Sequence, residues 1–271
     1  MDLANPIAAS PQMSFSMHMW GPLWTHGIFL AFVAGAVYAQ AITGFALALI
    51  LLGLVGATDL VPLPDAVNAT TIIGFCTAWM YLYRNKALRI ERTIVPTLIA
   101  SALSTFVGAL LLVWLADSAY QVLRFILGVS IVACALSLWR QGQPLPSLSS
   151  PAVFALTGAI SGLLAGMFSA SGPPLVYLLY RQPRPLAWVR QSLMVIFGLG
   201  TALRLLIVVP TGKFSLNALQ LALEALPVVF LVTFYAARRP PPLSPRFLKA
   251  LICVLLIATG LGMGISAISS F

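Results

Sequence analysis

Long apolar runs follow one another along almost the whole chain, separated by short polar connections. By hydropathy the runs fall at about 27–57, 66–83, 93–116, 119–139, 152–180, 189–210, 215–237 and 247–269. A run of about 20 apolar residues has the length that a helix needs to cross a bilayer. The pattern therefore predicts an all-α polytopic membrane protein with about eight hydrophobic segments. A transmembrane β-barrel is disfavoured, because barrel strands show short alternating patterns instead of continuous apolar runs.

The first and the fifth apolar segments are interrupted in the middle by polar, glycine and proline residues. The first reads GAVYAQAITGFALALILLGLV (35–55), and the fifth reads GAISGLLAGMFSASGPPLVYLLYR (158–181). Because lipid cannot hydrogen-bond a free backbone N–H or C=O, a broken helix at membrane depth must face protein or a water-filled cavity. Two such breaks in corresponding places of two halves indicate the substrate site of a secondary transporter.

The two halves form an internal repeat. After its broken segment, each half has a proline-bearing loop and a segment that opens with polar residues: VPLPDAVNATTIIGF (61–75) and QPRPLAWVRQSLMVIF (182–197). The proline- and serine-rich stretch between the halves is interpreted as a linker. The expected organisation is an N-terminal tail (1–26), a first transmembrane repeat (27–140), a linker (141–151) and a second transmembrane repeat (152–271). The tail lacks the positive start and apolar core of a secretory signal, so we interpret it as uncleaved.

Lysine and arginine residues indicate the topology. The basic connections RNKALRIER (84–92) and RRPPPLSPRFLK (238–249) should both be cytoplasmic. Five simple crossings between them would put them on opposite sides, and this conflict disappears if the fifth segment folds back at FSASGPP. The same fold-back in the first segment leaves Asp59 and Asp65 outside. Each half is then a re-entrant hairpin followed by three transmembrane helices, and the halves are inverted repeats.

Composition and charge agree with a membrane protein of the inner membrane. The chain is 60% hydrophobic and 8% charged, whereas soluble domains carry about 25% charged residues. The net charge of +9 is the usual lysine and arginine excess of cytoplasmic loops, and no soluble basic face exists for nucleic acid. The three cysteines lie in separate apolar runs, and no metal-ligand cluster, nucleotide-binding loop or catalytic triad occurs. The sequence therefore predicts no cofactor, no metal and no enzymatic activity.

Three stretches resemble the sulfite exporter TauE/SafE family of membrane permeases: AGAVYAQAITGFALALI (34–50), AVNATTIIGF (66–75) and SGLLAGMFSASGPPLVYLLY (161–180). Members of that family have two related halves, each opening with a glycine-rich broken segment. Many members carry adjacent glycines at each break, where this chain has Thr43-Gly44 and the stretch 169–174. The resemblance spans nearly the whole chain. It implies an exporter of sulfite, sulfonates or related small organic anions.

Two ionisable residues lie well inside apolar segments. A charge at the bilayer centre costs roughly 2.5–3.5 kcal/mol on the most lenient scale, so each residue needs a partner or a cavity. Arg204 is a candidate for substrate binding, because a guanidinium group matches an oxyanion with a rigid fork of donors. Glu224 is a candidate for proton coupling, because a carboxyl group removed from water can bind and release protons near neutral pH. The alternatives are a structural Arg204–Glu224 pair and an arginine side chain that reaches toward the membrane interface.

The breaks provide a second set of candidates. The N–H groups at the start of a half-helix can hold an oxyanion with the help of the helix dipole, and neighbouring hydroxyl and amide groups add donors. The alternative is close helix packing through small residues. The candidate substrate-binding residues at the breaks are Ser169, Ser171, Gly172, Gln40, Thr43 and Gly44.

Asn68 and Gln191 open the segments that follow the breaks, and they are further candidates for substrate contact. Helix capping is the alternative interpretation for both. Together these residues predict a secondary transporter that moves a small anion by alternating access, with protons as a possible coupling ion and membrane lipid as its surroundings. An anion channel, a non-transporting scaffold and an intramembrane enzyme remain as alternatives. An enzyme would need paired catalytic groups at one depth, and the apolar segments contain no such pair.

Overall fold

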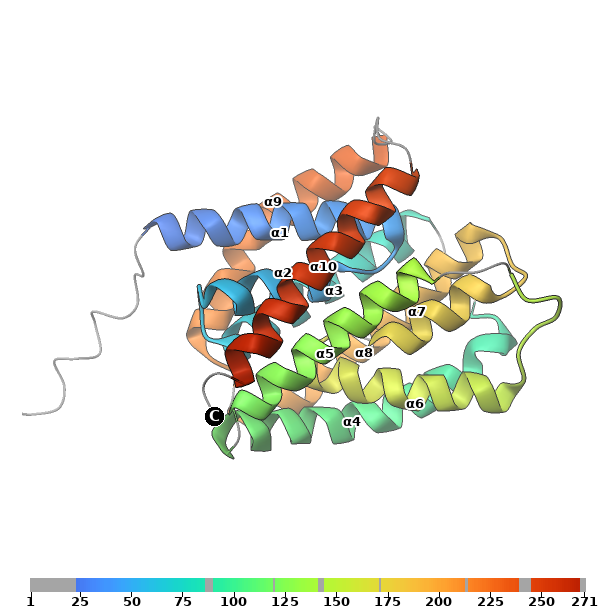
Figure 1. The fold of residues 1–271 in the computed structure, drawn as a ribbon, viewed down its shortest axis with the longest axis horizontal. Coiled ribbons are helices and arrows are strands. Elements are labelled where there is room, and N and C mark those ends of the chain that lie inside the picture. Colours follow the sequence, from blue (N-terminus) through green and yellow to red (C-terminus); the bar gives the residue numbers. More distant parts are fainter. Residues whose placement is uncertain are drawn as a thin grey trace, which may run out of the picture.

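The computed structural model describes residues 23–85, 90–118, 120–140, 144–170, 172–212, 214–238 and 245–268. These residues form α-helices, one 3-10 turn (η2, Arg92–Ile94) and no β-strand. The helices lie side by side in a bundle (Figure 1). Their bounds are α1 Leu23–Thr43, α2 Leu47–Thr58, α3 Leu63–Arg84, α4 Val95–Ser118, α5 Tyr120–Trp139, α6 Pro151–Phe168, α7 Gly172–Arg181, α8 Leu186–Val208, α9 Leu216–Arg238 and α10 Pro245–Ile268. The prediction of an all-α protein is confirmed.

The helix bounds follow the predicted apolar segments closely. The two broken segments each become a pair, α1 with α2 and α6 with α7, and the other six segments each become one helix. The largest difference is at the start, because α1 begins at Leu23, within the predicted tail. Among the described residues, five helices are long and apolar enough to cross a membrane: Trp24–Thr43, Arg92–Leu112, Pro151–Phe168, Leu186–Val208 and Leu216–Ala236. The fold is therefore that of a polytopic membrane protein.

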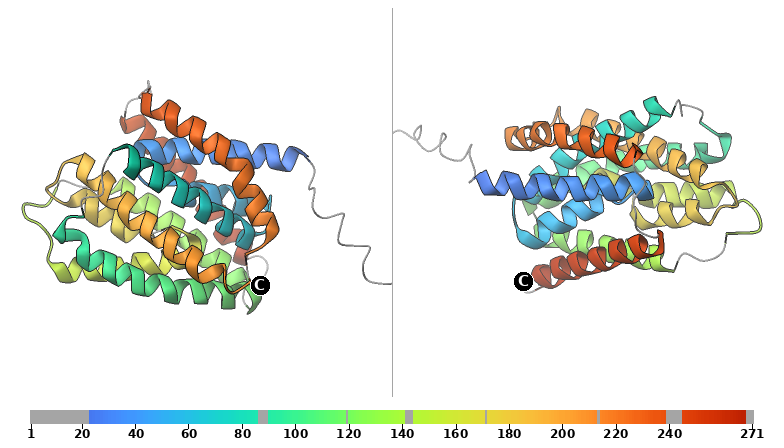
Figure 2. Two further views of the ribbon diagram at one scale, coloured as in Figure 1. Left: turned by 180° about the vertical axis from the view of Figure 1, so that it is seen from behind. Right: turned by 90° about the horizontal axis from the view of Figure 1, so that it is seen from above.

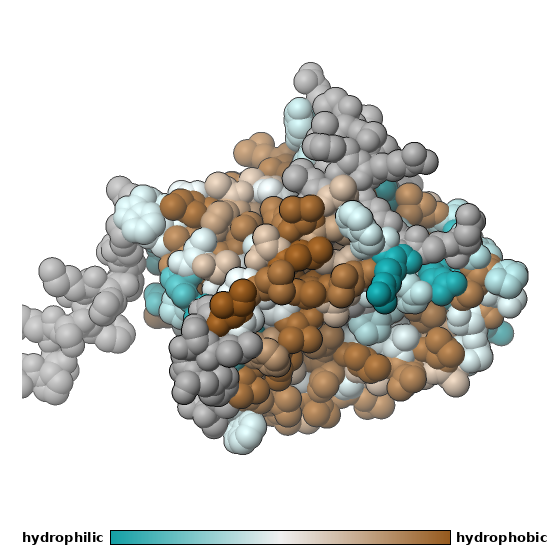
Figure 3. Space-filling model, in the orientation of Figure 1, coloured by the Kyte–Doolittle hydropathy of each residue, from teal (hydrophilic) through white to brown (hydrophobic). Residues whose placement is uncertain are grey.

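The surface agrees with this conclusion. Apolar side chains cover most of the face shown in Figure 3, and hydrophilic residues gather toward its ends. Large apolar residues are widely exposed on several helices, for example Leu103 on α4, Leu206 on α8 and Leu231 on α9. A soluble protein rarely exposes so much contiguous apolar surface, whereas a lipid-facing belt requires it.

Each broken segment folds back on itself. The helix α2 packs against α1, and α7 packs against α6, so that the second helix of each pair returns along the first (Figure 2). The α2–α3 and α7–α8 connections consequently lie at opposite ends of the bundle (Figure 1). This geometry supports the two hairpins that were inferred from the basic loops. The depth of the hairpins in a bilayer stays a prediction.

The helices α1–α5 of the first half correspond in order to α6–α10 of the second half, and contacts between the halves occur in matching pairs. The helix α4 packs on α6 as α9 packs on α1, and α5 packs on α7 as α10 packs on α2. Two further contacts, α3 with α8 and α5 with α10, each join a helix to its own counterpart in the other half. In Figure 1, α1 and α6 run in opposite directions. These relations support inverted repeats, which we keep as a proposal together with the predicted domain bounds.

The tightest helix pair is α4 and α6, and small residues make it possible. The glycines of α6 recur every fourth residue and contact the α4 backbone. A Cβ atom added at Gly158, Gly162 or Gly166 would lie 2.7, 2.3 or 2.2 Å from the nearest α4 carbonyl oxygen. The Thr105 hydroxyl also donates to the carbonyl of Gly162 (3.2 Å). Close approach through small residues is the usual means of helix association in lipid, and here it fixes the position of Gly166 near the centre of the bundle.

An arginine holds the far end of α2. Arg124 on α5 is only 7% exposed and donates from Nη2 to the carbonyl of Gly56 (2.8 Å). Its Nη1 atom lies 2.9 Å from the Asp59 carboxylate. The guanidinium therefore satisfies one carbonyl group, that of Gly56, which the end of α2 leaves without an intrahelical partner. This pair could not be predicted from the sequence, because the two residues are 65 positions apart.

Candidate functional site

Both broken segments turn sharply where their helices stop. At the first break, Gly44 (φ 81°) and Ala46 (φ 74°) adopt the left-handed backbone conformation, and at the second, Ser169 (φ 56°) and Gly172 (φ 58°) do so. Glycine adopts this conformation without cost, whereas Ala46 and Ser169 must be held in it by their surroundings. Each break therefore ends one helix and starts another within a few residues.

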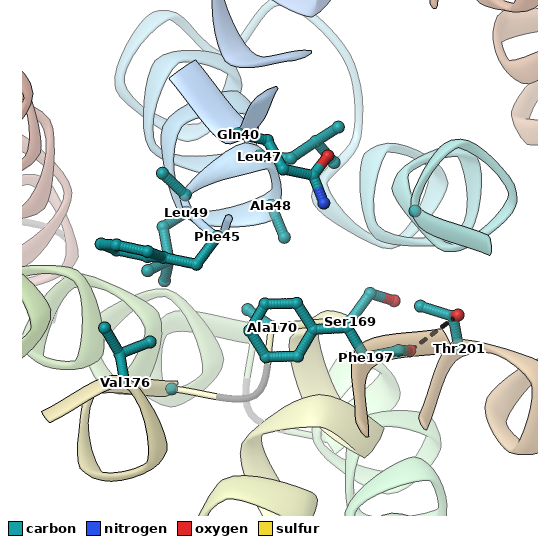
Figure 4. Close-up of a pocket in the computed structure, with 13 residues that line it drawn as sticks. Gln40, Phe45, Leu47, Ala48, Leu49, Ser169, Ala170, Val176, Phe197 and Thr201 are labelled. Carbon is teal, nitrogen blue, oxygen red and sulfur yellow. Dashed lines mark hydrogen bonds between the residues drawn. The ribbon is translucent and has the colours of Figure 1, made fainter. Parts of the chain in front are cut away.

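A cavity lies between the two breaks and takes its walls from both halves. In Figure 4, Gln40, Phe45 and the first turn of α2 face Ser169, Ala170 and Thr201 across it. Its volume is about 30 Å³, which leaves room for little more than water. The lining residues are Gln40, Phe45, Ala46, Leu47, Ala48, Leu49, Gly74, Ser169, Ala170, Gly172, Val176, Phe197 and Thr201. The starts of α2 and α7 both contribute, and the first N–H groups of a helix have no partner within that helix.

Arg204 lies directly behind the Ser169 side of the cavity. The residue is fully buried, with 0% of its surface exposed. Its Nε atom donates to the carbonyl of Gly166 (2.8 Å), its Nη2 to Oδ1 of Asn68 (3.0 Å) and its Nη1 to the hydroxyl of Thr71. The Thr71 hydroxyl is in turn hydrogen-bonded to the hydroxyl of Ser169, which lines the cavity. The hydroxyl groups of Thr71 and Ser169 therefore connect the guanidinium to the open space.

No carboxylate among the described residues pairs with Arg204. The ion pairs within the described residues are His26–Glu224, Arg124–Asp59 and Arg184–Glu91. The alternative of an Arg204–Glu224 pair is therefore wrong, and full burial also excludes an Arg204 side chain that reaches the interface. A buried cation with only neutral partners costs several kcal/mol. An anion in the adjacent cavity would offset much of that cost.

The second half of the chain also caps the end of α1. The hydroxyl of Tyr180 donates to the carbonyl of Thr43, and Nη2 of Arg190 donates to the carbonyl of Ile42. The Thr43 side chain turns inward and donates to the carbonyl of Ala39 (2.7 Å). The bonds from Tyr180 and Arg190 satisfy carbonyl groups at the end of α1, which the break leaves without intrahelical partners. The position of Arg190 beside a basic loop did not indicate this contact with the end of α1.

The candidate residues from the sequence fall into distinct places. Gln40, Ser169 and Gly172 line the cavity, and Arg204 and Asn68 form the buried network behind it. Thr43 and Gly44 build the turn but are not among the lining residues. Ser171 lies outside the described residues. Sequence reasoning did not single out Thr201, although it lies three positions before Arg204 and hence on the same helix face.

Gln191 and Glu224 lie away from this cavity. Gln191 lines a surface groove together with Glu91 and Trp188. Glu224 belongs to α9, where its Oε2 lies 2.6 Å from Nδ1 of His26 and its Oε1 accepts from Nε2 of Gln220 (2.8 Å). The histidine partner comes from α1, so this cluster joins two helices of different halves.

The turn at Gly44 provides a local test of the break. A Cβ atom there would lie 3.0 Å from Cγ of Arg190, on a backbone with φ +81°. We expect Gly44→Ala to cost about 2 kcal/mol of stability, part from backbone strain and part from displacement of Arg190. Gly212→Ala is the matched control, because Gly212 has φ +69° but nothing within 4 Å. Equal melting temperatures of the two purified variants would show that the Arg190 contact contributes nothing.

Comparisons with known proteins agree with this architecture. A family model described as sulfite exporter TauE/SafE matches residues 27–263. The chain is 31% identical over 242 residues to the probable sulfite/organosulfonate exporter TauE of Cupriavidus necator, covering 89% of this chain and 94% of that protein. It is 26% identical over 161 residues to the probable inner membrane transporter protein TsaS of Comamonas testosteroni, covering 58% of this chain and 66% of that protein. No solved structure matches the chain.

These matches extend far beyond the breaks. The family match includes the broken segments of both halves and most of α10. One relative is named as a probable exporter and the other as a probable inner membrane transporter. The apolar helices agree with a multi-pass protein of the inner membrane. The chain therefore belongs to the sulfite exporter TauE/SafE family and is a membrane transporter.

Proposed function

We propose that the protein is a secondary transporter that moves sulfite or a small organosulfonate through the cavity between its two breaks. The observation that carries the proposal is Arg204, a fully buried cation without a carboxylate partner among the described residues. It lies beside a cavity that both broken segments line. The relative from Cupriavidus necator is named as a probable exporter of such compounds, which supports the same substrate class.

The groups around the cavity suit an oxyanion. Ser169 and Thr201 offer hydroxyl groups, Gln40 offers an amide, and the starts of α2 and α7 offer backbone N–H groups. Arg204 orients the Ser169 hydroxyl through Thr71 and supplies positive potential from behind. In a dry interior a charge one layer away interacts far more strongly than it would in water. The anion is then held mainly by neutral donors, from which it can also be released.

The small volume of the cavity fits a closed state of an alternating-access cycle. A cavity of about 30 Å³ cannot admit an organosulfonate unless the two hairpins separate. Because each hairpin belongs to a different half, a relative movement of the halves would open the cavity toward one side at a time. A channel would instead need a continuous open path.

The proposal is tested by flux into proteoliposomes that contain the purified protein. A panel of sulfite, ethanesulfonate, taurine, sulfate and chloride is offered at increasing concentrations. We expect saturable flux of sulfite or a sulfonate, with little chloride flux. Flux that rises linearly with concentration would favour the channel alternative, and no flux of any anion would favour the scaffold.

Proton coupling is proposed for the pair of Glu224 and His26. The carboxylate and the imidazole lie 2.6 Å apart, so one proton can pass between two titratable groups, and they join helices of different halves. We expect Glu224→Gln to leave substrate affinity nearly unchanged and to abolish the stimulation of flux by a proton gradient. Gln220→Asn changes a neighbour of Glu224 without changing the charge, so it is the control and should keep the stimulation by a proton gradient. If Glu224→Gln keeps the full proton dependence of flux, Glu224 has no part in coupling.

A further inference from the structure

A second and larger cavity opens at the end of the bundle where α3 ends. Its volume is about 360 Å³, and we refer to it as the vestibule. It lies among α1, α3, α8 and α9, and it shares Gln40 with the inner cavity. The residues that line it are Val37, Gln40, Ala41, Thr77, Met80, Tyr81, Arg84, Asn85, Arg190, Met194, Thr233, Phe234 and Ala236.

The charged residues of the vestibule wall are all positive. Arg84 and Arg190 line it, and none of the described lining residues is an aspartate or a glutamate. Neither arginine belongs to an ion pair within the described residues. A concave wall that carries charge of one sign concentrates the field and raises the local concentration of the opposite ion.

Polar atoms without partners also point to an occupant. Oε1 of Gln40, Nε of Arg190 and Oγ1 of Thr233 are buried and have no hydrogen-bond partner among the described residues. All three residues line the vestibule, and Gln40 is only 5% exposed. Buried polar groups nearly always have a partner. Water or a bound solute can supply these partners, and the two donors among them, Nε of Arg190 and the Thr233 hydroxyl, suit an anion.

Gln40 connects the two cavities. Its Nε2 atom lies 4.0 Å from the sulfur of Met194, and a thioether is a weak acceptor. Met194 lines only the vestibule, whereas Gln40 lines both spaces. The amide can therefore turn toward an anion on either side at little cost. This position is suited to the passage between an outer and an inner binding place.

We propose that the vestibule is a second oxyanion site, where Arg84 and Arg190 hold a sulfonate or sulfite group before Gln40 passes it to the inner cavity. The transport role rests on the proposed function, but the binding itself does not. The same chemistry would accept the phosphate of an anionic lipid. The experiment below separates the two sources.

Labelling of a cysteine in the vestibule tests the proposal without a transport assay. In a chain whose native cysteines are replaced by alanine, Ala41→Cys places an exposed thiol in the vestibule wall. The rates of two methanethiosulfonate reagents are compared, one carrying an ethylsulfonate and the other a trimethylammonium group. We expect the anionic reagent to be favoured about 10-fold, because the basic wall attracts it. Ala57→Cys, exposed near the end of α2, is the matched control and should show a ratio near one.

The arginines and the occupant are then varied in the Ala41→Cys background. Arg84→Gln should remove most of the preference for the anionic reagent, and Arg84→Lys should keep it. Ethanesulfonate should protect the thiol in vesicles that contain only zwitterionic lipid. Equal rates for both reagents, or a preference that survives Arg84→Gln together with Arg190→Gln, would overturn the proposal. Protection by phosphatidylglycerol but not by ethanesulfonate would assign the site to a lipid headgroup. If the wild-type protein showed no anion flux, the proposed function would be wrong. The labelling rates would still show whether the vestibule binds an anion.

Discussion

Replacement of Arg204 by glutamine is expected to reduce saturable anion flux about 100-fold or more. The guanidinium makes charge-assisted bonds to the Asn68 and Thr71 side chains and through Thr71 orients Ser169. Loss of the charge and of these bonds removes roughly 3 kcal/mol of stabilisation from a bound anion, and every 1.36 kcal/mol corresponds to about a tenfold change in rate. The measurement is initial flux into proteoliposomes with equal amounts of folded protein, checked by gel filtration.

Two further variants show which property of Arg204 matters. One keeps its charge but changes its hydrogen-bonding geometry, and the other tests whether a general loss of stability would have the same effect. Arg204→Lys keeps the charge but cannot reach Gly166, Asn68 and Thr71 with one planar fork, so we expect partial flux with a raised KM. Arg124→Gln removes another buried arginine, which pairs with Asp59 at the far end of α2. It should lower the melting temperature and leave the KM of the remaining folded protein unchanged. If Arg204→Gln transports as well as wild type, the buried charge has no part in anion binding.

Gly162→Ala is expected to disrupt the fold far more than the alanine substitutions at Gly44 and Gly212. The new Cβ would lie 2.3 Å from the carbonyl oxygen of Ser101 and 2.5 Å from its Cα. The Ser104 hydroxyl, 2.4 Å away, can rotate aside, but the two Ser101 atoms belong to the backbone of α4 and cannot. We expect a loss of about 3 kcal/mol or more and a much lower yield of monodisperse protein in detergent.

The matched control for this prediction is Gly35→Ala on α1. Gly35 also lies within a helix, but an added Cβ would meet nothing within 4 Å, and alanine favours the helix. Its melting temperature should equal or exceed that of wild type. Similar melting temperatures for the two variants would show that α4 and α6 do not pack as closely as described.

The sequence predicted the helices and the breaks well, because both depend on local properties. Apolar runs of membrane length define the helices, and Gly44 and Gly172 occur where a left-handed backbone is needed. The need of Arg204 for unusual surroundings could also be predicted, because a charge in an apolar segment is costly wherever it lies.

The partners of these residues could not be predicted, because they are distant in the sequence. Asn68 and Arg204 are 136 positions apart, and His26 and Glu224 are 198 apart. The sequence therefore suggested a pair between Arg204 and Glu224, whose segments are neighbours along the chain, whereas the fold gives each a partner from the first half. Gln191 shows the same limit, since its place in a polar cluster did not reveal which helix face points to the cavity.

The two cavities together suggest a path for the anion. The vestibule carries Arg84 and Arg190 at its wall, and the inner cavity has Arg204 behind its hydroxyl groups. Between them stands a neutral amide, Gln40. An anion would thus move between regions of positive potential without forming a salt bridge that it could not leave. Moderate binding at each place allows both entry and release.

The central claim, that an oxyanion binds between the two breaks, is tested most directly by locating a heavy analogue. Crystals of the protein soaked in selenate, after selenate has been shown to compete with the transported anion, would be measured at the selenium absorption edge. The account predicts an anomalous peak in contact with Ser169 and the first turn of α2, and its loss in Arg204→Gln. Selenate bound elsewhere in wild type, with the space between the breaks empty, would contradict it.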